Sequence, residues 1–476
     1  MRVKKPPPIP DSFWQSVFSP RTVVVVGKTT RPKAGSMYLR ALINQGYRGK
    51  VTVVSTDSGG GFGYPCVDSI EELPHGIEYA ILCVPAREVP DAVRRLARRG
   101  VRVAHVFSSG FGDLGTADGR LLEADVKRAA DETGLRVIGP NCLGIFSPEV
   151  GLTYPPGIFP KEIGNVGFIS QSGGTTQSLI WGSRYYYFGI NKAVSLGNSV
   201  DLTAEDFLEV MIDDPGIEII ALYLEGISDS VRFMQLVRRG IVTKPIVILK
   251  AGLSEGGVSA AASHTGIMAG SAHIWEAAIR QAGAIRVQTL EELVQTVSAF
   301  AKKTGKVGER IALVNRGGGE GVVAADILPR MGLSVPAFSE ETRRALAAIM
   351  PAAGTGFRNP VDFSAIGGYP GVFEKMLDIA DADQNTDAVI YQHHIEFGHL
   401  FREGYNQYLL DAVIAFKERA QKMLLVVLPL YWSGEEWLRS FAYLNEKGVS
   451  THPTIDGAAT ALHNLTQWKG KRPSPE

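Results

Sequence analysis

His264 is the residue whose surroundings point most directly to chemistry. It lies in the segment SAAASHTGIMAGSA (259–272), among side chains too small to pack around an imidazole. Loops of this composition have low contact density and are able to move. Because imidazole is a good nucleophile near neutral pH, the pattern favours a histidine that carries a chemical group. Five glycines bracket His264 in this part of the chain: Gly252, Gly256, Gly257, Gly266 and Gly270.

Two other segments contain what such a histidine would need. SQSGGTTQSL (170–179) follows an apolar run and predicts a helix N-terminus, where backbone amides and hydroxyls favour an anion. An ordinary Ser/Thr helix cap is the alternative. Glu225 ends the apolar segment ALYLEG, at the expected carboxyl end of a strand, and is either an orienting carboxylate or an exposed strand-end charge. With His264 these groups would form a phosphohistidine site, provided that the segments converge in space.

A possible nucleotide turn follows the first apolar run, TVVVVG. Gly27-Lys28-Thr29 is similar to the end of a P-loop, but that motif needs a glycine five residues earlier, where Thr22 stands. The remaining prediction is a strand, a tight turn and a helix whose amides hold a phosphate or nucleotide, and a plain turn is the alternative.

Two other patterns indicate chemistry only weakly. His393, His394 and His399 in YQHHIEFGH have no carboxylate at a known metal-ligand spacing, so structural histidines are the preferred interpretation. NRGGGEG (315–321) has a loose dinucleotide-turn spacing. Cys142, which follows GPN at a strand end, is assigned to packing.

Short β-branched runs alternate with amphipathic stretches along nearly the whole chain, which predicts parallel α/β sheets. Pro- and Gly-rich residues 149–164 and charged residues 302–310 separate three domains, at 12–148, 160–304 and 305–470. The last two both begin with a strand, a glycine-rich turn and a helix, which indicates two copies of one fold.

Composition narrows the function classes. The 476 residues contain 49 Lys plus Arg and 49 Asp plus Glu, so net charge offers no argument for a nucleic-acid partner. Three cysteines match no zinc template and fit a reducing compartment. The longest apolar runs are far too short for a membrane span, and the N-terminal residues are not typical of a signal peptide. A cytoplasmic location is expected.

These segments together resemble the α subunit of the ADP-forming acyl-CoA synthetases (acetate–CoA ligase), relatives of succinyl-CoA synthetase, over nearly the whole chain. SHTGIMAGS, YLEGI and SQSGG carry the resemblance, with VSLGN, GPNCLGI and NPVD. It implies three doubly wound α/β domains: a Rossmann-like CoA-binding domain and two flavodoxin-like domains of the succinyl-CoA synthetase type. It also implies that His264 is phosphorylated and that Glu225 hydrogen-bonds it.

The resemblance assigns two sets of binding residues. The phosphate-binding set is Ser172, Gly173, Gly174 and Thr175. The CoA-binding set is Gly27, Lys28, Thr29, Thr30, Val84, Pro85, Ser108, Ser109 and Asn141. The sequence departs from the family at the first turn, usually Gly-Ala-Ser, and at the second strand, which usually ends in Asn-Pro.

The implied reaction is acyl-CoA + ADP + phosphate ⇌ carboxylate + CoA + ATP, by way of an acyl phosphate and a phosphohistidine. The three domains leave no room for an ATP-grasp fold, so a separate β subunit is expected to bind ATP or ADP and Mg²⁺. An inactive CoA-binding regulatory or scaffold protein of the same fold is the alternative. An NAD(P)-dependent dehydrogenase is less favoured, because Gly-x-Gly-x-x-Gly is absent at 27–32.

The carboxylic acid is left open. The resemblance favours a short acid such as acetate. The aromatic segment WGSRYYYFG (181–189) either lines a pocket for a larger acid or packs against other parts of the protein.

Overall fold

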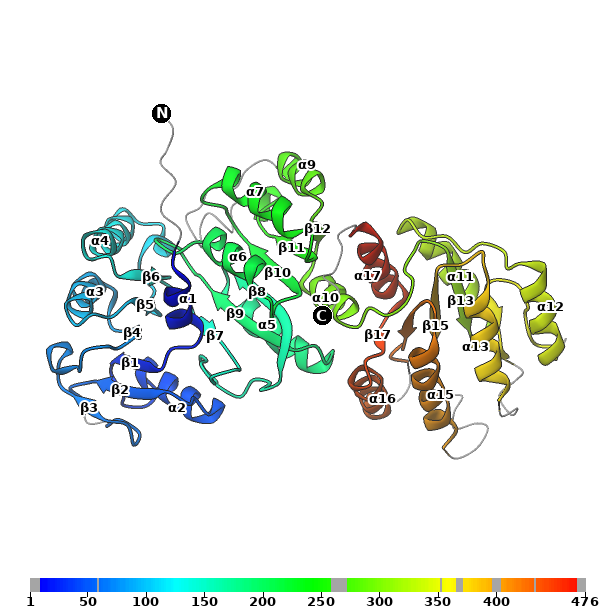
Figure 1. The fold of residues 1–476 in the computed structure, drawn as a ribbon, viewed down its shortest axis with the longest axis horizontal. Coiled ribbons are helices and arrows are strands. Elements are labelled where there is room, and N and C mark those ends of the chain that lie inside the picture. Colours follow the sequence, from blue (N-terminus) through cyan, green and yellow to red (C-terminus); the bar gives the residue numbers. More distant parts are fainter. Residues whose placement is uncertain are drawn as a thin grey trace. The chain divides into compact units, whose positions relative to one another are not determined.

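The computed structural model describes residues 9–57, 60–257, 272–351, 353–364, 371–395, 404–431 and 434–468. It contains three β-sheets, each combined with α-helices (Figure 1). The chain divides into two compact units. Unit 1 comprises residues 1–181, 189–288 and 470–476, and unit 2 comprises residues 182–188 and 289–469.

The first sheet of unit 1 is entirely parallel and has the strand order β3-β2-β1-β4-β5-β6. This is the order of the Rossmann fold. Its strands are β1 (Thr22–Gly27), β2 (Lys50–Val54), β3 (Cys66–Val67), β4 (Tyr79–Cys83), β5 (Val103–Val106) and β6 (Arg136–Ile138). The helices are α1 (Asp11–Phe18), α2 (Ala34–Gln45), α3 (Val89–Arg98) and α4 (Ala117–Thr133).

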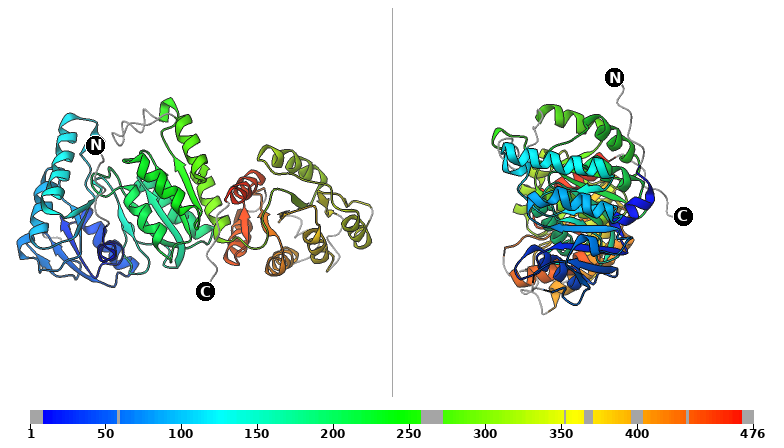
Figure 2. Two further views of the ribbon diagram at one scale, coloured as in Figure 1. Left: turned by 45° about the horizontal axis from the view of Figure 1, so that its top comes forward. Right: turned by 90° about the vertical axis from the view of Figure 1, so that its left-hand side faces the viewer.

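The valine run of β1 is buried on both sides because helices cover both faces of the sheet (Figures 1 and 2). Val24 and Val26 join the core formed with α3 and α4. On the other face, Tyr38 of α2 packs edge-on against His105 of β5, with ring centroids 5.5 Å apart. Parallel strands covered on both faces are expected to be continuously apolar, as this one is.

The second sheet of unit 1 has the order β12-β11-β10-β8-β9-β7. Its five parallel strands follow the flavodoxin order, and β7 adds an antiparallel edge. The strands are β7 (Gly144–Phe146), β8 (Ile163–Ser170), β9 (Ile190–Ser195), β10 (Ile219–Leu224), β11 (Ile246–Lys250) and β12 (Ile285–Val287). The helices are α5 (Gly173–Tyr185), α6 (Ala204–Asp213), α7 (Ser230–Gly240) and α9 (Ala272–Ala282).

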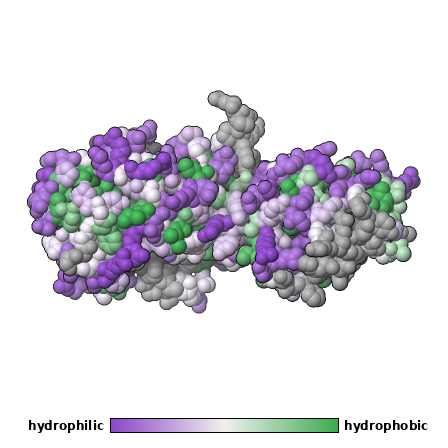
Figure 3. Space-filling model, turned by 90° about the horizontal axis from the view of Figure 1, so that it is seen from below, coloured by the Kyte–Doolittle hydropathy of each residue, from purple (hydrophilic) through white to green (hydrophobic). Residues whose placement is uncertain are grey.

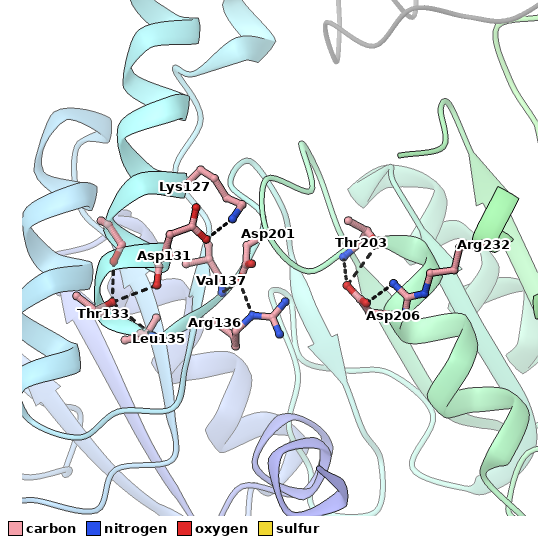
Figure 4. A network of polar contacts seen from close by, with 12 residues as sticks. Lys127, Asp131, Thr133, Leu135, Arg136, Val137, Asp201, Thr203, Asp206 and Arg232 are labelled. Atoms are coloured by element: carbon pink, nitrogen blue, oxygen red, sulfur yellow. Dashed lines mark hydrogen bonds and ion pairs between the residues drawn. The ribbon is translucent and has the colours of Figure 1, made fainter. Parts of the chain in front are cut away.

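Partly buried polar contacts connect the first two sheets (Figure 4). The carboxylate of Asp201, before α6, accepts hydrogen bonds from Arg136 Nε and from the Val137 amide of β6, both at 2.8 Å. Asn198 Nδ2 donates to Glu123 Oε2 of α4 at 2.6 Å. A site that takes residues from both sheets is therefore held at a defined geometry.

The sheet of unit 2 has the order β14-β13-β15-β16-β17, again the flavodoxin order with all strand pairs parallel. The predicted three doubly wound domains are confirmed by these strand orders. The strands of the unit 2 sheet are β13 (Ile311–Asn315), β14 (Val361–Asp362), β15 (Ala388–Gln392), β16 (Met423–Val427) and β17 (Ser450–His452). The helices are α10 (Leu290–Ala301), α11 (Gly318–Arg330), α12 (Glu340–Ile349), α13 (Val372–Ala382), α15 (Tyr405–Arg419), α16 (Gly434–Glu446) and α17 (Ile455–Gln467).

The surface is mixed in character. On the face that Figure 3 displays, small hydrophobic areas alternate with hydrophilic ones. Within the described ranges, no helix combines the length and the apolar character that crossing a membrane requires.

Candidate active site

A cleft of about 1240 Å³ in unit 1 contains most of the predicted binding residues. It extends from the loops that follow the strands of the first sheet to the N-terminus of α5 in the second. Small-molecule sites typically measure roughly 300–1,000 Å³, so this cleft suits a long ligand. The predicted residues that line it are Gly27, Lys28, Val84, Pro85, Ser108, Ser109, Asn141, Ser172, Gly173 and Gly174.

Gly27, the last residue of β1, allows the chain to turn sharply at the cleft, where β1 lies beside β4. Its φ is +146°, and a Cβ atom there would lie 2.4 Å from the carbonyl oxygen of Cys83. Gly35 of α2 is equally constrained, because a Cβ would lie 2.6 Å from the Lys28 carbonyl oxygen. Both glycines are needed for the loop to pack closely against its neighbours.

The carboxylate of Asp57 occupies the turn after β1. Its Oδ2 accepts hydrogen bonds from the amides of Thr29 and Thr30, both at 2.9 Å, and its Oδ1 accepts one from Thr29 Oγ1 at 2.7 Å. In this structure Asp57 accepts from both amides, and Thr29 and Thr30 do not line the cleft, so their role in a phosphate cradle stays a prediction. The spacing of residues in the sequence could not reveal these hydrogen bonds, because Asp57 lies in the loop after β2, far along the chain from Thr29 and Thr30.

Replacing Asp57 by asparagine should lower Tm at pH 7 by about 2–4 °C. Both carboxylate oxygens accept hydrogen bonds from the turn after β1, and asparagine has only one acceptor oxygen. Burial alone would raise the pKa of Asp57, but hydrogen bonds from Thr29, Thr30 and Ser55 hold it well below its usual range. A depressed folded-state pKa adds stability above the unfolded pKa of about 3.9, and that stability is lost as the pH falls through the folded value.

The Tm difference between wild type and Asp57→Asn should therefore shrink below about pH 4. Calorimetric scans from pH 7 to pH 3 measure it. Asp68→Asn, at an exposed carboxylate, is the control and should change Tm little at any of these pH values. Equal effects of the two substitutions would contradict the role assigned to Asp57.

Three cationic side chains line the end of the cleft that follows β1 and β4: Lys28, Lys33 and Arg87. All three are exposed, and Lys33 is the N-cap of α2 without a side-chain hydrogen bond to the helix. A helix N-terminus flanked by lysines favours phosphate. Arg95 also lines the cleft, but Glu71 pairs with its guanidinium.

The inner end of the cleft lies where the first sheet meets α5. Asn141, Cys142 and Leu143 line it together with residues 171–174. A Cβ atom on Gly173 would lie 3.0 Å from Leu143 Cγ, so the two loops are in close contact. Burial raises the pKa of the Cys142 thiol, which leaves it a poor nucleophile and fits the packing role predicted for it.

The segments GPN and VSLGN, far apart in the sequence, meet at this inner end. The Asn198 amide donates to the Pro140 carbonyl at 3.0 Å. A Cβ on Gly197, which has a φ of +54°, would lie 2.2 Å from the same oxygen. The loop after β9 therefore supports the loop that carries Asn141.

The start of α5 has the geometry of an anion site. Ser172 caps the helix: its Oγ accepts from the Thr175 amide at 3.3 Å, and its carbonyl accepts from the Thr176 amide at 3.0 Å. Around Gly174 the space is open, since a Cβ there would meet no atom within 4 Å. Thr175 does not line the cleft, whereas Ser172, Gly173 and Gly174 do.

Glu225 lies at the switch point of the second sheet, between the ends of β8 and β10, where ligands bind in folds of this type. The residue is only 6% exposed, so it is not the exposed strand-end charge of the alternative interpretation. Tyr223 donates from its hydroxyl to Glu225 Oε1 at 3.3 Å. Burial, with a smaller contribution from the Glu225 carboxylate, raises the pKa of Tyr223 to about 12, which keeps that hydroxyl protonated.

Residues that sequence reasoning did not single out hold the Glu225 loop. Gln171 Oε1 accepts from the amides of Glu225 and Gly226, at 2.6 and 2.9 Å. Lys250 Nζ, at the end of β11, donates to the Glu225 carbonyl at 2.8 Å. Glu205 Oε1 accepts from the amides of Ser228 and Asp229 at 3.0 and 2.8 Å. Only Gln171 had a sequence signal, as part of SQSGG.

His264 lies outside the described residues. The two flanking elements are placed: β11 ends at Lys250, beside Glu225, and α9 begins at Ala272. Ser172–Gly174 lie close to Glu225, because the side chain of the preceding Gln171 accepts a hydrogen bond from the Glu225 amide. The position of the imidazole relative to them stays a prediction.

His393 and His394 follow β15, at the switch point of the third sheet. His393 Nε2 is 2.7 Å from Asn406 Oδ1 and its Nδ1 is 2.8 Å from the Tyr391 hydroxyl. Burial lowers the pKa of His393 to about 4, so it is neutral. His394 Nε2 lies 2.9 Å from Glu320 Oε2 of α11. No group of three potential metal ligands occurs among the residues with described positions, and His399 is not one of them.

The aromatic side chains of residues 181–188 do not line the cleft. Tyr186 is buried, donates to Glu291 Oε1 at 2.7 Å and packs edge-on against Phe441, with centroids 5.2 Å apart. Tyr185 and Tyr187 are exposed. Of the two interpretations of this aromatic segment, a pocket lining or packing against other parts of the protein, the contacts of Tyr186 favour packing within unit 2.

A Rossmann domain and a flavodoxin-like domain that share one cleft, with a buried glutamate beside a helix N-terminus, define the class of CoA-dependent acyl ligases. The family model described as a CoA binding domain matches residues 21–148. The model described as a succinyl-CoA ligase like flavodoxin domain matches residues 163–300.

Similarity to characterised relatives extends over most of the chain. The α subunit of acetate–CoA ligase [ADP-forming] I from Pyrococcus furiosus is 32% identical over 95% of this chain and 97% of its own length. The corresponding α subunit of ligase II is 34% identical, with 94% and 96% covered. The chain therefore belongs to the family of α subunits of ADP-forming acetate–CoA ligases. It spans only 54% of acetate–CoA ligase [ADP-forming] I from Archaeoglobus fulgidus, to which it is 35% identical.

A solved structure is similar over nearly the whole chain. It is the dinucleotide forming acetyl-coenzyme A synthetase 1 of Candidatus Korarchaeum cryptofilum, in complex with phosphate and ADP. It is 29% identical, with a TM-score of 0.81 and with 95% of this chain and 96% of that chain covered.

Proposed function

We propose that the chain is the α subunit of an ADP-forming acyl-CoA synthetase, which interconverts acyl-CoA, ADP and phosphate with a carboxylic acid, CoA and ATP. The observation that carries this proposal is the cleft, which extends from a cationic end to the start of α5, next to the buried Glu225. The family to which the chain belongs supports the same conclusion.

CoA would lie along the cleft with its phosphates near Lys28, Lys33 and Arg87. Its thiol would reach the inner end, between Asn141–Leu143 and Ser172–Gly174. The amides and hydroxyls at the start of α5 would hold the phosphate that attacks the thioester. No metal ligand is required of this chain in that step.

His264 would then take the phosphoryl group from the acyl phosphate. Glu225 would accept a hydrogen bond from the imidazole, which fixes its tautomer and stabilises its positive charge. An ATP-grasp β subunit, with ATP or ADP and Mg²⁺, would receive the phosphoryl group from the loop. The α-subunit relatives and the longer single-chain relatives are consistent with such a partner.

The isolated chain should bind CoA without forming ATP, and ATP should form from acyl-CoA, ADP and phosphate only when the β subunit is added. Calorimetry with CoA and with NAD, followed by a coupled ATP assay, tests this expectation. Lys28→Ala should weaken CoA binding about tenfold, the equivalent of one lost phosphate contact. Lys127→Ala, at a cation that pairs with Asp131 on α4, is the control.

Tighter binding of NAD than of CoA, or ATP synthesis by the chain alone, would contradict the proposed function. Failure of every acid and acyl-CoA tested with the complete complex would favour the inactive scaffold.

A further inference from the structure

Gln171 connects the cleft to the loop of the buried carboxylate. It lies between β8 and α5, lines the cleft and is only 4% exposed. Its Oε1 accepts hydrogen bonds from two successive backbone amides, those of Glu225 and Gly226, at 2.6 and 2.9 Å.

Those two hydrogen bonds determine which way the amide group is turned. A carboxamide nitrogen cannot accept a hydrogen bond, so the atom that faces the two amides must be Oε1. Nε2 therefore projects away from the Glu225 loop. No acceptor within the described part of the chain hydrogen-bonds to Nε2, so a side chain of the cleft wall has an N–H donor left for a ligand.

The neighbours of Gln171 indicate which ligand atom this donor would meet. Ser172, Gly173 and Gly174 follow it directly at the start of α5, where the proposed function places phosphate. Asn141 to Leu143 lie across the inner end, where it places the CoA thiol. A carbonyl group that exchanges between thiol and phosphate must lie between these two positions.

We propose that Gln171 Nε2 donates a hydrogen bond to the acyl carbonyl oxygen during exchange between thioester and acyl phosphate. This inference rests on the proposed function. An oxygen of hydrogen phosphate attacks the carbonyl carbon, the C=O electrons move to oxygen, and the tetrahedral intermediate collapses with cleavage of the C–S bond. The phosphate proton passes to the CoA thiolate, so the products are acyl phosphate and CoA.

The donor contributes most when negative charge develops on the carbonyl oxygen, and removal of one such donor typically lowers the rate about 10²–10³-fold. Gln171 has a second role through its oxygen, which positions Glu225. The two roles can be separated, because the carboxylate of glutamate can still accept from both amides but has no N–H to donate.

The experiment compares Gln171→Glu with Gln171→Met in the chain combined with its β subunit. Gln177→Glu is the matched control, since Gln177 lies on α5, which begins just after Gln171, but its Nε2 donates to the Pro155 carbonyl, outside the cleft. Two rates are measured for each variant: acyl-CoA formation, and transfer of label from ATP to His264, which involves no acyl group.

For Gln171→Glu we expect acyl-CoA formation to fall about 10²–10³-fold while His264 labelling stays within about threefold of wild type. For Gln171→Met, which has neither group, both rates should fall. Equal losses of the two rates in Gln171→Glu, or wild-type rates in either variant, would overturn the inference. A wild-type complex that neither labels His264 nor forms acyl-CoA would instead contradict the proposed function.

Discussion

Replacing His264 by alanine should lower ATP-dependent acyl-CoA formation by about 10⁴-fold or more and leave CoA binding unchanged. Loss of a covalent nucleophile removes the step on which the whole route depends, and such losses reach about 10⁶-fold in a well-studied hydrolase. CoA binding should persist because the cleft is formed by residues 26–174. Initial rates with the complete complex and calorimetry with CoA measure the two quantities.

Labelling identifies the modified residue directly. With labelled ATP and Mg²⁺ the complex should acquire an acid-labile, base-stable label that is lost in His264→Ala and His264→Asn. His273→Ala, at an exposed histidine on α9, should retain label and activity. Label that survives in both His264 variants would place the phosphoryl group elsewhere.

Glu225→Gln should slow phosphoryl transfer by about 10²–10⁴-fold, the range for loss of a carboxylate that orients a catalytic imidazole. The residue is buried, and glutamine has the same shape and can still accept from the Tyr223 hydroxyl. The fold and CoA affinity should therefore change little. What is lost is the negative charge that stabilises a positively charged imidazole.

Glu218→Gln is the matched control for Glu225→Gln. Glu218 stands just before β10, at the other end of the strand, and is exposed, with Asn165 Nδ2 donating to its carboxylate at 3.0 Å. It should retain full activity. Turnover of Glu225→Gln near the wild-type rate, with normal His264 labelling, would mean that Glu225 serves structure alone.

The sequence alone was sufficient to predict the fold class and most strands. Continuous apolar runs such as TVVVVG, interrupted by glycine and followed by amphipathic segments, are the local consequence of parallel strands covered on both faces. The short strands β3, β7, β12, β14 and β17 were not predicted, since a strand of two or three residues rarely shows a period. The order of the strands in each sheet could not be predicted from local sequence patterns; only the family resemblance implied it.

Candidate site residues could be predicted where function imposes a local signature. Glycines before a helix start and a carboxylate after an apolar strand are visible in the sequence, and Ser172 and Glu225 lie at such positions. Their distance from each other and from the CoA-binding loops depends on sheet topology, which brings the carboxyl ends of parallel strands to one edge.

Only the tertiary structure decided which groups are already occupied and which remain for a ligand. The amides of Thr29 and Thr30 have the sequence context of a nucleotide turn, yet Asp57, from the loop after β2, accepts hydrogen bonds from both. Gln171 is ordinary by type, yet the amides of Glu225 and Gly226, directly after β10, determine its orientation and leave its nitrogen without an acceptor among the described residues. Hydrogen-bond partners that come from distant strands have no period or spacing in the chain, so the sequence determined the kinds of group present and the fold determined their use.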